Sequence, residues 1–176
     1  MIQNKQDYYA YLAADSAANG WNHDWTRFLK IQYWYLRRLR KTEYLLNCNK
    51  KLRYMFSRLL LVKTGEKAGW TIPANVFGKG LMVPHYGTII VNKSARFGEN
   101  CVVQCGVNVS EGASGGNHIY FAAGCKVMKN VHIADDVIIG ANAVVTKDVL
   151  EPDVVIGGIP AKIISHNGYA SRTERI

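Results

Sequence analysis

Cysteine and proline are scarce in this 176-residue chain, with four of each. Cys48, Cys101, Cys105 and Cys125 form no CxxC pair and show no spacing typical of metal ligands. We therefore expect reduced thiols in a protein core, rather than a disulfide framework or a zinc site. This cysteine usage favours a cytoplasmic protein.

Long apolar runs are also missing. No stretch approaches the roughly 20 residues that span a bilayer, and the start MIQNKQDYYAYLAADS lacks the charged-then-apolar layout of a secretion signal. The 48% hydrophobic and 20% charged content is that of an ordinary soluble globular protein. We expect a cytoplasmic protein of one domain with a small appendage.

Acidic residues are few in the first part of the chain. Residues 1–70 hold 13 of the 22 Lys/Arg and 5 of the 13 Asp/Glu, a balance of +8, whereas residues 71–176 hold the other 9 and 8, a balance of +1. The net charge of +9 therefore belongs almost entirely to the N-terminal part. This asymmetry indicates that the two parts do different jobs.

Residues 1–70 carry helical patterns. DYYAYLAADSAANG predicts a helix with Asp7 as its N-cap and Asn19-Gly20 as its stop. A second helix is predicted to start near Asp24, and a third, KKLRYMFSRLLLVK, to end near Gly65. In the second helix, steps of three and four residues place five apolar side chains on one face, namely Phe28, Leu29, Tyr33, Leu36 and Leu39.

The basic, aromatic character of these helices allows more than one interpretation. The preferred one is a helical cap that packs on the next domain or on a neighbouring subunit. Peripheral contact with an anionic membrane surface, at the inner face of the membrane, is the alternative, because basic amphipathic helices with tryptophan bind there. No nucleic-acid partner is expected, since no recognition motif accompanies the charge.

Apolar residues recur at every sixth position from residue 97, and we call these the repeat positions. They are Phe97, Val103, Val109, Gly115, Phe121, Val127, Ile133, Ile139 and Val145, and only Gly115 is not apolar. An α-helix with 3.6 residues per turn would spread a period of six around its whole surface. A parallel β-helix fits the period, since three short strands make one coil of roughly 18 residues.

A second column lies three residues after the repeat positions. It consists of Asn100, Gly106, Gly112, His118, Gly124, Asn130, Asp136 and Asn142. Glycine, asparagine, aspartate and histidine tolerate positive φ better than other residues. The column therefore predicts one corner in the left-handed backbone region after each strand.

With this pattern, the segments IPANVFGKGLMVPHYGTIIVN, ARFGENCVVQCGVNV, IIGANAVVTKDV and IGGIPAK resemble the left-handed β-helix hexapeptide-repeat acyltransferases. The similarity is greatest to the serine acetyltransferase-like branch, which includes capsule and surface polysaccharide O-acetyltransferases. It implies a mainly β fold, a left-handed parallel β-helix over residues 71–166, after the helical region 1–70 and before a C-terminal tail, 167–176. It also implies a homotrimer with acetyl-CoA as co-substrate and no tightly bound cofactor.

The repeat breaks once, before residue 91. The positions run from Val91 back to Val83, a step of eight instead of six, and then return to six at Phe77. Two extra residues in a regular coil force a bulge, and this bulge contains PHYGT with His85. A histidine side chain suits general-base work on a hydroxyl, and the resemblance places the catalytic histidine in this segment.

His118 is the second candidate catalytic residue. Serine acetyltransferases carry another active-site histidine after a Gly-rich stretch, and this chain has SEGASGGNHIYF there. Because the repeat passes through this stretch unbroken, a corner position accounts for His118 without catalysis, and both interpretations stay open. No metal site is expected, since His85, His118 and His132 lack the spacing of the zinc-dependent members of the superfamily.

The residues around these histidines concern the acceptor. Pro84, Trp70 and Asn117 stand where serine acetyltransferases have two acidic residues and an arginine, so the charges suited to a zwitterionic serine are missing. We therefore expect a sugar acceptor, from a capsule or surface polysaccharide or its precursor, with serine as the alternative. Trp70, Tyr86 and Asn117 are the candidate substrate-binding residues, and packing is the alternative role for Trp70.

The resemblance also suggests where acetyl-CoA binds. It implies a groove along the coil, between two subunits, lined by Ala123 and Ala141. Gly158 and Lys162 of GGIPAK would meet the nucleotide end, where a lysine suits phosphates. A β-helix that merely docks other proteins, without acetyl-CoA affinity, is the non-enzymatic alternative.

Overall fold

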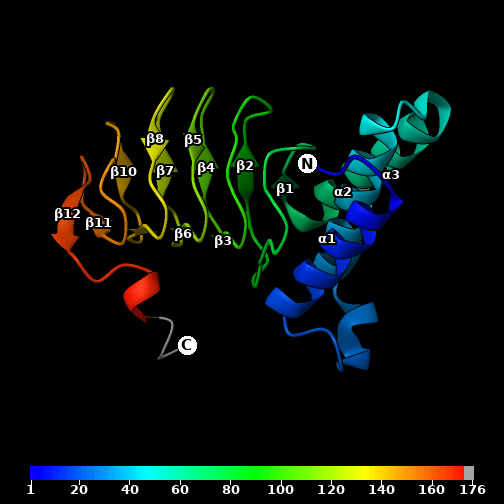
Figure 1. Ribbon diagram of the computed structural model, residues 1–176, viewed down its shortest axis with the longest axis horizontal. Helices are drawn as coiled ribbons and strands as arrows, with labels where there is room; N and C mark the ends of the chain where they lie inside the picture. Colours follow the sequence, from blue (N-terminus) through cyan, green and yellow to red (C-terminus); the bar gives the residue numbers. More distant parts are fainter. Residues whose placement is uncertain (173–176) are drawn as a thin grey trace.

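A helical region stands at one end of the molecule and a stack of short strands extends away from it (Figure 1). The computed structural model describes residues 1–172. Within them, no helix has both the length and the apolar character needed to cross a membrane.

The helical region contains α1 (Lys5–Ala18), the 3₁₀ helix η1 (Trp25–Leu29), α2 (Ile31–Asn47) and α3 (Lys51–Ala68). The predicted N-cap Asp7 is wrong: Asn4 caps α1, and its side chain accepts a hydrogen bond from the Asp7 backbone N–H. Asp24 does begin a helix, but only the short η1, because extended backbone at Lys30 separates η1 from α2. α3 runs past Gly65 and ends at Gly69, which adopts a left-handed φ of 76°.

This break at Lys30 also overturns the single apolar face predicted for the second helix. Tyr33, Leu36 and Leu39 lie on α2 and are buried in the core. Phe28 and Leu29 lie on η1, whose axis is not continuous with α2, and are 50% and 79% exposed.

The strands form three parallel sheets, with one antiparallel addition at the end. Their bounds are β1 (Trp70–Thr71), β2 (Ile89–Val91), β3 (Val102–Val103), β4 (Asn108–Val109), β5 (Ser114–Gly115), β6 (Tyr120–Phe121), β7 (Lys126–Val127), β8 (His132–Ile133), β9 (Ile138–Ile139), β10 (Val144–Val145), β11 (Val155–Gly157) and β12 (Lys162–Ser165). The sheet orders are β1-β2-β4-β7-β10, β12-β11-β9-β6-β3 and β5-β8. Asn108 of β4 pairs with Lys126 of β7, the third strand after it, so three successive strands make one coil. The predicted parallel β-helix is confirmed.

The repeat positions point into this β-helix. All of them except Gly115 are at most 7% exposed and belong to one continuous core. At Gly115, a Cβ would meet the Ile119 side chain at 2.5 Å and the Phe97 ring at 3.0 Å, so neighbouring side chains fill the space of the missing one. Hydrophobic burial along the axis therefore holds the coils together.

The corner column is confirmed at all eight positions. Each has a positive φ, between 53° for His118 and 77° for Gly106. Corners one coil apart lie one above the other: the Asn142 backbone N–H donates to the Ala123 carbonyl one coil earlier. The left-handed corners therefore set the direction in which each short strand leaves.

The predicted bulge is also confirmed. Phe77 bridges Phe97 and Met82 bridges Val102, whereas Ile90 pairs with Asn108. The two residues of a bridged pair are thus two positions further apart in the sequence before the bulge than after it. The two extra residues therefore lie between Met82 and Ile90.

A buried ion cluster joins the helical region to the first coil. Arg40 of α2 is 0% exposed and contacts Asp15 at 2.7 Å and Glu43 at 3.0 Å, while its guanidinium also donates to the Phe77 and Gly78 carbonyls. Asp15 accepts in turn from the backbone N–H groups of Gly80 and Leu81. Burial raises the pKa of Glu43, and the neighbouring Arg40 charge opposes this rise. The cluster thus fixes the chain just before the bulge.

The C-terminal segment packs on the coils as far as it is described. The backbone N–H groups of Gly168 and Tyr169 donate to Asp153 and Asp136, and the Tyr169 ring stacks on His118. The expected tail, 167–176, is therefore packed in its first part, and residues 173–176 lie outside the described residues. Cys48 and Cys105 are half-buried rather than core thiols, which corrects the expectation for those two residues.

We predict that Arg40→Met destabilises the fold strongly, because two buried carboxylates lose the cation they share. The expected loss in the free energy of unfolding is about 3–5 kcal/mol, measured by urea unfolding. Arg37→Met is the matched control: this α2 arginine lies 5.3 Å from the Tyr33 ring, and its loss should cost less than about 1 kcal/mol. Equal midpoints for Arg40→Met and the parent would contradict the prediction.

Candidate functional site

The bulge lies on one edge of the β-helix, which we call the His85 edge. It consists of the corner segments 84–88, 104–107, 122–125, 140–143 and 157–161, which link the sheet of β3 to the sheet of β2 or lie above that link. Backbone hydrogen bonds join neighbouring segments, from Gly106 to Thr88 at 2.6 Å and from Gly124 to Cys105 at 2.9 Å. One continuous edge therefore begins at His85.

The helical region holds the bulge from behind. The Asn19 side chain donates to the Leu81 carbonyl and accepts from the Val83 backbone N–H. Gln32 of α2 donates to the Pro84 carbonyl at 3.5 Å. The other side-chain atom of Gln32, Oε1, is buried without a hydrogen-bond partner among residues 1–172, and such an atom calls for a donor from elsewhere.

His85 and Tyr86 stand at the tip of this bulge. Both are exposed, Tyr86 at 61%. Within residues 1–172, no hydrogen bond or ion pair engages the His85 imidazole, in contrast to His118. The backbone turns at Gly87, where φ is 123° and a Cβ would approach that of Cys105 to 3.0 Å. The imidazole is thus free to meet a molecule bound along the edge.

Ala123, Ala141 and Gly158 lie on the same edge and are all exposed. Lys162 follows the last segment and is exposed at the start of β12. Four coil steps of about 4.8 Å each put Gly158 roughly 19 Å along the edge from the bulge. These small, exposed residues lie between the His85 imidazole and the Lys162 ammonium along this edge.

Asn117 and His118 lie on a different edge, between the sheets of β5 and β6. His118 contacts Asp136 at 3.1 Å and Asn100 at 3.2 Å, and its φ is 53°. Asn117 accepts from the backbone N–H of Glu99. Within one protomer, His118 serves as a corner residue. The structure does not bring it to His85.

Trp70 does not offer the ring face that sugar stacking needs. It is 3% exposed and packs edge-on against Tyr35, with ring centroids 5.1 Å apart. The expectation of a sugar-stacking Trp70 is corrected in favour of packing, because the residue is buried and Tyr35 of α2 packs against its ring.

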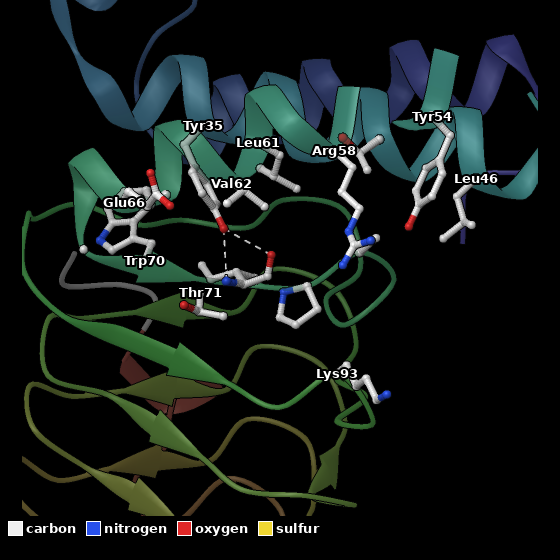
Figure 2. Close-up of a pocket in the computed structure, with 16 residues that line it drawn as sticks. Tyr35, Leu46, Tyr54, Arg58, Leu61, Val62, Glu66, Trp70, Thr71 and Lys93 are labelled. Carbon is white, nitrogen blue, oxygen red and sulfur yellow. Dashed lines mark hydrogen bonds between the residues drawn. The ribbon is translucent and has the colours of Figure 1, made fainter. Parts of the chain in front are cut away.

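A groove of about 830 Å³ separates α3 from the first coil (Figure 2). Inside it, the Tyr35 hydroxyl donates to the Ile72 carbonyl and accepts from the Ile72 N–H. Arg58 extends from α3 toward the coil, between Tyr35 and Tyr54, and Lys93 lies below on the coil. His85 does not line this groove, so we do not assign it to the candidate site.

Sequence patterns missed three residues of the site. Asn19 and Gln32 support the bulge from helices far away in the chain, and no local signal marks them. Cys105 could have been found, because the period of the coil places it directly above Gly87. No group of three or more His, Cys, Asp and Glu residues within 1–172 is placed to hold a metal ion.

Comparison with known proteins points to one class. No family model matches the chain. A serine acetyltransferase of Staphylococcus xylosus is 32% identical over 130 residues, which is 68% of this chain and 59% of that protein. The chain thus spans about three fifths of the length of this relative.

Solved structures share the fold. A serine acetyltransferase from Brucella abortus in complex with coenzyme A has a TM-score of 0.75 at 22% identity, over 94% of this chain and 70% of that one. A serine acetyltransferase of Neisseria gonorrhoeae in complex with serine has a TM-score of 0.74 at 23% identity, over 92% and 70%. The chain therefore has the left-handed β-helix with N-terminal helices that serine acetyltransferases have.

We predict that maleimide at pH 8 modifies Cys105 and Cys48 and spares Cys101 and Cys125. Burial raises the pKa of Cys101 and of Cys125 to about 12, so at pH 8 both remain neutral thiols, which do not react. Cys105 and Cys48 are half-buried. Peptide mass mapping of the folded protein measures this. Modification of Cys125 ahead of Cys105 would contradict the geometry of the His85 edge.

Proposed function

We propose that this chain is an acetyl-CoA-dependent O-acetyltransferase in which His85 is the general base. The observation that carries the proposal is the position of His85, exposed on the two-residue bulge at the start of an edge of small residues. The similarity to serine acetyltransferases supports it, since one of their structures contains coenzyme A.

The chemistry follows from the imidazole. His85 takes the proton of the acceptor hydroxyl while the oxygen attacks the thioester carbonyl of acetyl-CoA. The carbon–sulfur bond then breaks, and the imidazolium returns its proton to the departing thiolate. The products are an acetyl ester and free CoA. A donor to the tetrahedral oxyanion, such as a backbone N–H along the edge, stabilises the intermediate.

Acetyl-CoA lies along the His85 edge in this proposal. Ala123 and Ala141 leave room for the extended pantetheine arm, and backbone groups of these segments offer hydrogen bonds. Gly158 admits the nucleotide end, where the exposed Lys162 ammonium attracts phosphate groups.

L-serine is the acceptor that the relatives favour, because they are serine acetyltransferases by name and one structure contains serine. A sugar is the second candidate. It is favoured by uncharged residues at Pro84 and Asn117, which offer no charged partner for an ammonium or a carboxylate, and by the exposed Tyr86 ring beside His85. None of the relatives compared above has a name that refers to a polysaccharide. A capsule or surface polysaccharide acceptor is therefore part of the second candidate function only.

A homotrimer completes the site. His85 and His118 occupy different edges of one protomer, so a site with both needs the His118 edge of a neighbouring copy. A cyclic, head-to-tail contact brings unlike edges together. The buried, unpartnered Oε1 of Gln32 behind the bulge is consistent with a site that a ligand or a neighbouring copy completes.

We predict that His85→Ala lowers kcat about 10²–10⁴-fold while the fold persists, because the proton loses its acceptor. CoA release is followed with a thiol reagent, with L-serine and with a panel of sugars as acceptors. His132→Ala is the matched control, since His132 is exposed on another face and its imidazole bonds only Ser114 among the side chains described. Turnover by His85→Ala at the parent rate would refute the base assignment. Turnover of serine alone would exclude the sugar.

We also predict complementation between inactive variants. Chains with His85→Ala and chains with His118→Ala should each have low activity alone. CoA release should return when mixed oligomers are assembled, because one interface between two chains then contains both histidines. Light scattering should give three times the chain mass. A fully active His118→Ala protein, or a monomeric parent, would show that the site lies within one protomer.

A further inference from the structure

Helix α3 carries apolar side chains on its outer side. Four residues, which we call the α3 stripe, recur at steps of three and four: Leu52, Met55, Phe56 and Leu59, exposed at 85%, 67%, 66% and 51%. A helix of a globular protein normally turns such a stripe toward the core. In residues 1–172 the core takes the opposite face of α3, through Ser57, Leu61 and Thr64. The stripe therefore faces outward, where contiguous apolar surface marks a docking site.

A cationic groove adjoins the α3 stripe, between α2 and α3. It has a volume of about 770 Å³ and is lined by Tyr8, Trp34, Arg37, Arg38, Lys41, Leu45, Leu52, Arg53, Phe56, Ser57 and Leu60. Its four cations face no acidic lining residue, and no ion pair within residues 1–172 neutralises them. Leu52 and Phe56 belong to both the stripe and the groove, so the two form one surface.

More positive charge flanks the stripe. Lys51, Arg58, Lys63 and Lys67 are exposed along α3, where Glu66 is the acidic residue. Trp34 is 41% exposed at the far end of the groove and contacts the exposed Phe28 of η1. Apolar and aromatic side chains bordered by cations thus occupy one side of the helical region.

We propose that the cationic groove and the α3 stripe dock the protein on an anionic phospholipid surface. Lipid phosphates meet the groove cations, and the stripe enters the boundary between headgroups and acyl chains, as in helices that lie in a membrane interface. The helical region is at one end of the molecule (Figure 1), so the outer coils project into solvent. This inference does not depend on acetyl transfer.

Charge argues against a two-fold related copy as the occupant. A two-fold contact places the same patch on both partners. It would set the groove cations and the α3 cations of one chain against those of the other, and such like-charge contacts are costly. An anionic bilayer instead supplies charges of the opposite sign.

The test is co-sedimentation of the full chain with vesicles of phosphatidylcholine, with and without phosphatidylglycerol. We expect binding only to the vesicles with phosphatidylglycerol, and a loss of binding as NaCl is raised. Tryptophan fluorescence should shift to the blue on these vesicles. Because Trp21 and Trp70 are 4% and 3% exposed, the shift reports on Trp25 and Trp34.

Two variants test the surface itself. Replacing Arg37, Lys41 and Arg53 by glutamine should lower vesicle affinity on the order of 100-fold, and Leu52→Gln with Phe56→Gln should abolish the fluorescence shift. Matched controls are glutamine at Lys93, Lys126 and Lys147, with the same change in net charge, and at Leu150 and Ile164, which are 72% and 66% exposed on the coils.

If the control variants lose as much vesicle affinity as the groove and stripe variants, the proposal is overturned, because binding would then depend on overall charge and not on this surface. Equal binding of the parent protein to vesicles with and without phosphatidylglycerol would also overturn the proposal. So would the absence of binding to both kinds of vesicle. So would a smaller particle mass for Leu52→Gln/Phe56→Gln in the absence of lipid, because the stripe would then join copies of the chain. Acetyl transfer by the parent protein is measured separately, so the failure of one proposal leaves the other standing.

Discussion

The left-handed corners are the constraint on which the structure depends. Each parallel strand is only two or three residues long, so strand pairing alone fixes little of the path of the chain. A residue with positive φ follows each strand from β3 to β9, and Asn130 or Asp136 can adopt this conformation where most residues would be strained. Because these turns are alike, successive coils have the same shape and stack on one another. The repeat positions then meet along one axis and bury a continuous apolar column.

A uniform β-helix offers no place for chemistry, because every coil repeats its neighbour. The two residues inserted before Ile90 break this uniformity and push His85 out of the wall. Arg40 and Asp15 hold the preceding segment, 77–81, and Asn19 and Gln32 hold the bulge from behind. The helical region therefore has a structural role at the site, since it makes an irregular loop rigid. Its outer side, with the α3 stripe and the cationic groove, is left for a separate contact.

The family resemblance suggested Ala123, Ala141 and Gly158 for acetyl-CoA, and the structure places them on the edge of His85; their role there is part of the proposal. Trp70 illustrates a miss: an aromatic residue just before the first coil suits sugar stacking in sequence, but it is buried and the Tyr35 ring of α2 packs against it. Phe28 and Leu29 were assigned to the wrong surface because extended backbone at Lys30 separates two helices that the apolar spacing joins. Burial by a distant element leaves no local pattern.

The sequence by itself determined the coils, the corners and the position of the bulge. All three depend on backbone preferences and on burial between one coil and the next, both of which repeat visibly in the chain. Only the tertiary structure decided which helix faces stay exposed and that His85 and His118 occupy different edges. It also decided that a buried arginine locks the helices to the first coil. These features depend on contacts between segments far apart in the chain, such as Arg40 with Asp15 and with Phe77, and no period in the sequence encodes such contacts.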